Sequence, residues 1–355
     1  MEPFSPPEVN TDEGYLVIDG FLNVGSDTSR IELSHTQNAN ATTAVTKETS
    51  SVVSVEEENG ATYAFTEKGN GSYFLPPRQF NQAVKYRLRV KTVNGKEYLS
   101  DYVEVKSTPP IDNIEGKVDP RQDAMVMYVN THDATNNTRF YRWKFEETWE
   151  YRTAFFSSLE IVKKPTGDDY EIGSRKADIN LCYRTLKSAN ILLGSTIKLS
   201  QDIIKDLPLT AVPISSNKLY FKYSILVKQY GLTQDAFEYW TSLAKTTEGT
   251  GSLFDPLPSQ VTGNIKNTAD AQELVFGYFS ASVEQKRRIF LTPYLGSYPR
   301  CTVPDTATIA DALKAPGSML LNYFGPRSEF VLISSPFCLD CRVQGGTTTK
   351  PSFWE

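Results

Sequence analysis

Histidine is scarce in this sequence: only His35 and His132 are present, and they fall in different predicted domains. A Ser-His-Asp triad or an imidazole metal site needs histidine close to its partners, so neither is expected. Phosphate-binding glycine loops, Gly-x-Ser-x-Gly and His-Glu-x-x-His are also absent. Carboxylate runs such as "SVEEENG" are too common to indicate glycosidase chemistry. The sequence therefore predicts a protein that is not an enzyme and has no cofactor, with a hydrolase of unrecognised carboxylate site as the remaining enzymatic alternative.

Long apolar runs and clusters of basic residues are missing as well. No segment approaches the roughly 20 consecutive apolar residues that span a bilayer. The net charge is −5 and the basic residues are scattered, which argues against a nucleic-acid surface. The opening "MEPFSPPEVNTDEG" lacks the basic and apolar segments of a signal peptide. Its prolines and polar residues predict a tether over residues 1–13.

Short β-type segments follow the tether. From residue 14 to residue 108, alternating apolar and polar residues are separated by turns such as Asn59-Gly60 and Asn94-Gly95. The clearest hairpin is "VKYRLRVKTVNGKEYLSDYVEV". About seven short strands in about 95 residues are typical of an immunoglobulin-like β-sandwich. The Cys…Trp…Cys framework of antibody domains is absent, so kinship with antibodies is not implied.

The segment "STPPIDN" predicts a domain boundary, because its two prolines stiffen the chain and remove backbone donors. A larger β-rich domain is expected over residues 112–355. Within it, "RFYRWKFEETWEYR" alternates an aromatic face with a charged face, as a half-buried strand does. One helix is expected near residues 233–247, with Thr233 as N-cap. The segments "ELVFGYFSAS" and "KRRIFL" are interpreted as a hairpin. The predicted fold class is mainly β, with one clear inserted helix.

The four cysteines allow three interpretations. Cys338 and Cys341 form a Cys-x-x-Cys pair, whereas Cys182 and Cys301 are isolated. A zinc site usually needs a second close pair, and a redox pair normally opens a helix, which the following Gly-Gly and threonine run oppose. Two disulfides in an oxidising compartment are favoured over free thiols and metal, with the pairing open. They would clasp the tail, and Trp354 would pack at its end.

Several segments, taken in order, resemble a known family. They include "EPFSPPE", "YLVIDGFLN", "YRLRVKTVNGKEYLSD", "THDATNNTRFYRWKFEETWEY", "YSILVKQYGLTQDAFEYWTSLAKTTEGTGSLFDPLPSQVTGNI" and the tail "CLDCRVQGGTTTKPSFW". Together they cover nearly the whole chain. The sequence resembles the Bacteroidota outer-membrane lipoproteins catalogued as domain of unknown function 4249.

This resemblance implies a place in the cell and a partner. Such lipoproteins carry lipid on a mature N-terminal cysteine, and here Met1 stands where that cysteine is expected. Attachment to the outer membrane, at the cell surface, would then be through an N-terminal lipid only. The family is typically encoded beside TonB-dependent transporters, which are the expected partners. Passage through the periplasm also fits disulfides. The family supplies no catalytic residues.

The function expected from these observations is non-enzymatic: a binding or accessory subunit of a TonB-dependent nutrient transporter, with a glycan, peptide or metal chelate as ligand. An adhesion or envelope-structural module is the alternative. Aromatic residues support ligand binding only if they meet at one exposed cleft, and core packing is their ordinary role. The loop "GSLFDPLPSQVTGN" is either functional or an ordered connector. The candidate ligand-binding residues are Trp143, Trp149, Tyr151, Tyr239 and Trp240.

Overall fold

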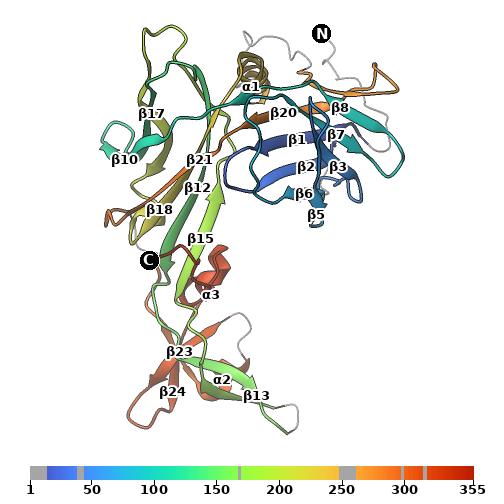
Figure 1. Ribbon diagram of the computed structural model, residues 1–355. Coiled ribbons are helices and arrows are strands. Elements are labelled where there is room, and N and C mark those ends of the chain that lie inside the picture. Colours follow the sequence, from blue (N-terminus) through green and yellow to red (C-terminus); the bar gives the residue numbers. More distant parts are fainter. Residues whose placement is uncertain (1–13, 38–43, 167–168, 248–260, 297–299, 315–317) are drawn as a thin grey trace, which may run out of the picture.

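The computed structural model contains two β-sandwiches and a smaller distal lobe (Figure 1). It describes residues 14–37, 44–166, 169–247, 261–296, 300–314 and 318–355. Strands make up most of the regular structure, so the predicted mainly β fold class is confirmed. The tether predicted for residues 1–13 lies outside the described residues.

The first sandwich consists of two sheets that bury alternate apolar residues between them. Ile18 and Ile31 from one sheet and Leu88 from the other are fully buried in its core. The first sheet has the order β5 (Thr66–Glu67), β6 (Ser72–Leu75), β2 (Ser29–His35), β1 (Leu16–Asn23), β20 (Phe276–Ser282) and β9 (Val105–Lys106). The second has the order β19 (Ile265–Asn267), β8 (Glu97–Ser100), β7 (Tyr86–Lys91), β3 (Val52–Glu57) and β4 (Thr62–Ala64).

The first sandwich is not confined to residues 14–108, as the sequence suggested. Strand β20 lies parallel to β1, and β19 lies antiparallel to β8, so residues 265–282 complete this sandwich. The expected hairpin of β20 with β21 (Gln285–Leu291) is wrong, because β21 pairs with β18 (Tyr223–Gly231). Alternation along a strand indicates which face is buried but does not specify its partner. The expected domain of residues 112–355 is therefore interrupted.

The second sandwich packs a three-stranded sheet against a larger one. Met127, Trp143 and Ile225 are fully buried between the sheets. The smaller sheet has the order β10 (Ile111–Asp119), β11 (Ala124–Asp133) and β17 (Asp202–Pro213). The larger has the order β15 (Leu181–Lys187), β12 (Phe140–Arg152), β18 and β21, and β16 (Leu192–Ser195) also pairs with β12. A short 3-10 helix, η1 (Asn217–Leu219), precedes β18.

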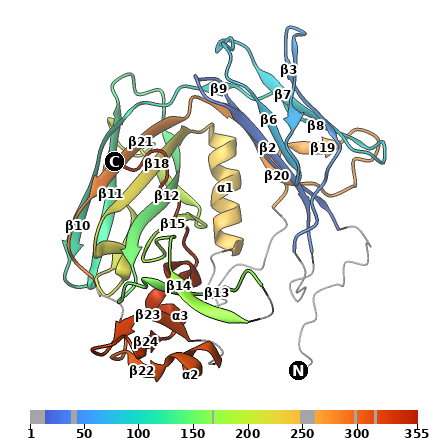
Figure 2. The same cartoon turned by 90° about the horizontal axis from the view of Figure 1, so that it is seen from below.

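Helix α1 (Gln234–Thr247) lies between the two sandwiches (Figure 2). Its predicted N-cap is confirmed, since the hydroxyl oxygen of Thr233 accepts a hydrogen bond from the backbone N–H of Ala236 at 3.2 Å. The buried side chains of Tyr239 and Trp240 form a core with Tyr230 of β18 and Tyr278 of β20. The helix thus joins the two sandwiches through one aromatic cluster.

The distal lobe was not distinguished in the sequence. It contains the pair β13 (Leu159–Lys163) and β14 (Tyr170–Ser174), the sheet β22 (Asp305–Thr308), β24 (Phe330–Ser334) and β23 (Met319–Phe324), and helix α2 (Ile309–Lys314). Its core of buried residues is small: Leu159, Ala312, Leu320 and Val331.

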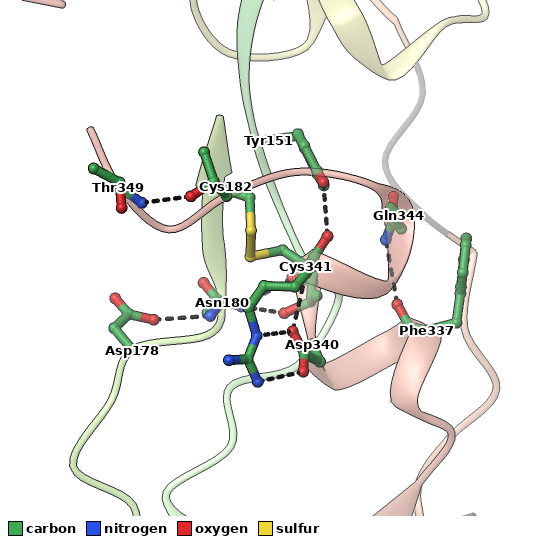
Figure 3. The surroundings of a disulfide bond; sticks show 12 residues. Tyr151, Asp178, Asn180, Cys182, Phe337, Asp340, Cys341, Gln344 and Thr349 are labelled. Atoms are coloured by element: carbon green, nitrogen blue, oxygen red, sulfur yellow. Dashed lines mark hydrogen bonds and ion pairs between the residues drawn. A yellow bond between two sulfur atoms is a disulfide. The ribbon is translucent and has the colours of Figure 1, made fainter. Parts of the chain in front are cut away.

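Two disulfides fasten the C-terminal tail, as predicted. Cys341 bonds Cys182 of β15 (Figure 3). Cys338 bonds Cys301, so the two halves of the Cys-x-x-Cys pair have different partners. Cys338 lies in helix α3 (Pro336–Leu339), and Cys341 begins the 3-10 helix η2 (Cys341–Gln344). Near the end of the chain, Trp354 is 4% exposed and packs on Tyr183 and Phe290.

Candidate functional site

A cleft of about 420 Å³ lies between the first and second sandwiches, beside helix α1. We call it the inter-sandwich cleft. Strands β1, β2 and β6 line one side, strands β12, β15 and β18 line the other, and Trp240 comes from the helix. The volume lies within the range of small-molecule sites, and such sites are frequent between domains.

Strand β12 presents its charged face to this cleft. Arg142, Lys144 and Glu146 line the cleft, whereas the alternating Tyr141 and Trp143 are fully buried in the core on the other face. The side-chain period of two along a strand produces this separation. The face that the sequence identified as charged therefore lies against the first sandwich.

Arg142 is held by an aromatic ring rather than by a carboxylate. Its guanidinium carbon lies 3.4 Å from the centroid of the Trp240 ring. Its Nε is buried without a hydrogen-bond partner, and within the described residues the side chain forms no hydrogen bond and no direct ion pair. Burial lowers the pKa of Arg142, and the charge of Asp19 only partly opposes this effect. The cation–π contact leaves the donors of the guanidinium edge unused.

Lys144 faces the first sandwich. Its Nζ lies 3.6 Å from Oδ2 of Asp19, on strand β1, and the Asp19 side chain is 51% exposed. Burial lowers the pKa of Lys144, the charge of Asp19 raises it, and the nearby Arg142 lowers it further. The charge of Asp19 thus acts on both Arg142 and Lys144.

The strand register adds further positive charge. Lys144 of β12 lies directly opposite Lys228 of β18, and Glu146 lies opposite Lys187 of β15. Lys228 donates a hydrogen bond to Glu146 at 2.7 Å. Burial alone would raise the pKa of Glu146, but the Lys228 hydrogen bond together with the charges of Lys228, Lys187 and Arg288 outweighs it, and the pKa lies below its ordinary value. Lys187 is exposed and forms no ion pair among the described residues.

The remaining charges of the cleft are matched. Glu284 accepts hydrogen bonds from Tyr230 and, at 2.9 Å, from Lys286, and Arg30 pairs with Glu32. The excess positive charge therefore belongs to the face of the larger second-sandwich sheet. There, four cations face two carboxylates: Arg142, Lys144, Lys187 and Lys228 against Asp19 and Glu146.

The five aromatic residues proposed from the sequence do not meet at one cleft. Trp143, Trp149 and Tyr151 are buried in the core of the second sandwich, where the Tyr151 hydroxyl donates to the backbone oxygen of Cys341 at 2.7 Å. Of the two on helix α1, Trp240 lines the inter-sandwich cleft. Arg142, Lys144 and Lys187 were not proposed. The signal for Arg142 and Lys144 is the charged face of residues 140–152, whereas Lys187, at the end of β15, has no comparable signal.

Tyr239 lines a second cleft, of about 770 Å³, on the other side of helix α1. Its charged residues are mainly acidic: Asp101, Glu104, Asp235 and Glu238, with Lys85 as the lysine. The loop "GSLFDPLPSQVTGN" ends at this cleft, but residues 251–260 lie outside the described residues.

Within the described ranges, His, Cys, Asp and Glu side chains form no group of three or more suited to a metal ion. The described helices include none with the length and apolar character needed to cross a bilayer.

A family model, "Domain of unknown function (DUF4249)", matches residues 1–288. The chain belongs to this family. The match includes most of both sandwiches and the strands that supply the four cations. It does not extend to the tail that contributed to the resemblance. Cys182 lies within the matched residues, and the other three cysteines lie beyond them.

Comparisons with curated proteins and with solved structures do not indicate a function. None of the curated proteins compared with this chain matches it. Among solved structures, a mutant of Salmonella alpha-2-macroglobulin is similar at 10% identity and a TM-score of 0.20, and the alignment covers 94% of this chain and 18% of that protein. This likeness carries no argument about the DUF4249 protein.

Proposed function

We propose that this DUF4249 protein is a non-enzymatic ligand-binding or accessory subunit of a TonB-dependent nutrient transporter, anchored to the outer membrane by an N-terminal lipid. The observation that carries the proposal is the inter-sandwich cleft, where the buried Arg142 and the exposed Lys187 form no direct ion pair within the described residues. Burying the charge of Arg142 without an ion-pair partner is unfavourable, and a ligand that completes the pairing would offset this cost.

The position of the cleft supports binding rather than simple spacing. Side chains from both sandwiches line it, with Asp19 and Phe21 of β1 on one wall and Arg142 and Lys144 of β12 on the other. A module that acts only as a spacer has no need of a cleft between its sandwiches. An aromatic ring beside an unpaired cation is typical of small-molecule sites, which are largely apolar with a few orienting polar groups.

The disulfides support the proposed compartment. Cys182–Cys341 and Cys301–Cys338 account for all four cysteines. Disulfides persist in the periplasm and at cell surfaces and are rare in a reducing cytosol. This chemistry fits a protein that matures through the periplasm, as the proposed lipid anchor requires.

The proposal is tested by affinity purification of the lipidated, full-length protein from its native outer membrane, followed by mass spectrometry. Stoichiometric recovery of a TonB-dependent transporter is expected. A matched bait in which the lipid-bearing cysteine is replaced by serine serves as control, because it loses the anchor while keeping the folded protein. Recovery of no transporter, in detergents that preserve other transporter complexes, would instead favour the adhesion or envelope-structural alternative.

A further inference from the structure

We infer that the inter-sandwich cleft binds a small molecule through an oxyanion, a carboxylate or phosphate group, attached to an apolar body. The oxyanion lies against Arg142, Lys144 and Lys187, and the body lies against the aromatic wall that Phe21 and Trp240 provide. The inference rests on the proposed binding function and names the ligand class of the same site. Its basis is the arrangement of charges on one sheet face.

The cations of this face are arranged by the strand register. Arg142 and Lys144 are two residues apart on β12 and so point to the same face. Lys228 is directly opposite Lys144. Like charges at directly opposed positions destabilise a sheet unless a counter-charge lies between them or above them. The two carboxylates in reach, Asp19 and Glu146, serve four cations and leave two positive charges unbalanced.

The unused donors point to an oxyanion rather than to a neutral hydroxyl compound. The Trp240 ring contacts the guanidinium of Arg142, and no nitrogen of that group donates a hydrogen bond within the described residues. A carboxylate or phosphate accepts such donors in a bidentate manner, and charged hydrogen bonds of this kind are the strongest that proteins make. Water in the cleft satisfies donors but does not balance charge.

The end of the cleft beside helix α1 favours an apolar group. Phe21 of β1 packs edge-to-face on Tyr230, with ring centroids 4.9 Å apart, and both line the cleft together with Trp240. Tyr230 lies directly opposite Arg142 in the sheet, so an oxyanion held by Arg142 and Lys144 places the rest of the molecule beside these rings. The ligand would then contact both sandwiches.

Isothermal titration calorimetry of the full chain tests the inference with four probes that share a phenyl ring: benzoate, phenyl phosphate, benzyl alcohol and benzylamine. At least one anionic probe is expected to bind at least about tenfold more tightly than benzyl alcohol, as a charge-assisted hydrogen bond allows. Benzylamine is expected to bind most weakly. Preference for benzoate assigns a carboxylate ligand, and preference for phenyl phosphate assigns a phosphate ligand.

Three variants locate the binding. Lys187→Gln, at an exposed position, should weaken the preferred anion about fivefold or more without changing the melting temperature. Asp19→Asn should tighten it, because a competing carboxylate is removed. Lys205→Gln, on the outer strand β17, is the matched control and should leave the affinity unchanged.

Two results would overturn the inference: anions that bind no more tightly than benzyl alcohol, or an affinity for anions that is the same in Lys187→Gln, Asp19→Asn and the unmodified protein. The melting temperature of each variant separates lost binding from lost folding. The membrane purification tests the transporter separately. Recovery of a transporter together with indifference to anions would refute the ligand class alone, and anion binding without a transporter would refute the partner alone.

Discussion

Removing the Cys182–Cys341 disulfide should destabilise the protein more than removing Cys301–Cys338. The two bonds link residues 159 and 37 positions apart. Loop-closure entropy in the unfolded chain then gives about 5 kcal/mol for the first and about 4 kcal/mol for the second, as upper limits. Cys182 and Cys341 are also fully buried in the core of the second sandwich, so their loss removes packing as well.

The assay compares two double variants, Cys182→Ala with Cys341→Ala and Cys301→Ala with Cys338→Ala, by differential scanning calorimetry of the full chain. A loss of about 3 kcal/mol in the first variant corresponds to a fall of roughly 6–12 °C for a domain of 150–250 residues. The second should fall by less. An equal or larger fall in the second variant would refute the argument that loop length and burial set the order.

Three other changes test the fold. Trp354→Ala should cost about 3 kcal/mol in urea unfolding, since Trp354 is 4% exposed, whereas Phe353→Ala, 36% exposed, should cost less than half of that; similar losses would contradict the clasp. Gly277→Ala should cost several times more than Gly60→Ala: both have positive φ, but only at Gly277 would a Cβ meet a backbone oxygen of β1, at 1.8 Å, and equal melting temperatures would contradict the placement of β20. Asp133 is partly buried, which opposes ionisation, but hydrogen bonds from Thr135 and Thr138 lower its pKa to about 2, so it contributes stability that is present above about pH 4 and lost between about pH 4 and pH 2. Asp133→Asn should therefore cost about 1–2 kcal/mol in urea unfolding at pH 7 and clearly less at pH 2.5, and a cost independent of pH would contradict this assignment.

Strand β12 shows what the sequence could predict. Alternation over residues 140–152 indicated a strand with a buried aromatic face, and Tyr141 and Trp143 are indeed fully buried. The same alternation identified Arg142, Lys144 and Glu146 as the opposite face. It did not indicate that the first sandwich lies against that face, because the contact comes from strand β1, which is distant in the sequence. The local pattern predicts which face of the sheet a residue lies on, but it does not predict which other elements contact that face.

Strand β20 shows why the domain boundary was only partly predictable. The "STPPIDN" segment does separate β9 of the first sandwich from β10 of the second. No comparable signal shows that the chain returns to the first sandwich at β20 and leaves it again at β21. The two strands are short, apolar-rich segments joined by a brief connection, as in a hairpin. Parallel pairing with β1 requires Gly277 to adopt φ of +116° close to the β1 backbone. A glycine within a strand indicates that another backbone comes close to it, but it does not identify which strand that backbone belongs to.

The returning chain has a consequence for the cleft. Among the described elements, the chain passes between the sandwiches three times: from β9 to β10, from α1 to β19, and from β20 to β21. A single linker would leave the sandwiches free to reorient, because relative motion is the ordinary state of linked domains. Three connections and the aromatic cluster around Trp240 hold Asp19 and Phe21 opposite Arg142 and Lys144 before any ligand arrives. Binding in the cleft would require little ordering of the protein, which favours affinity. The same connections hold the unbalanced charges of the β12 face in place in the folded protein.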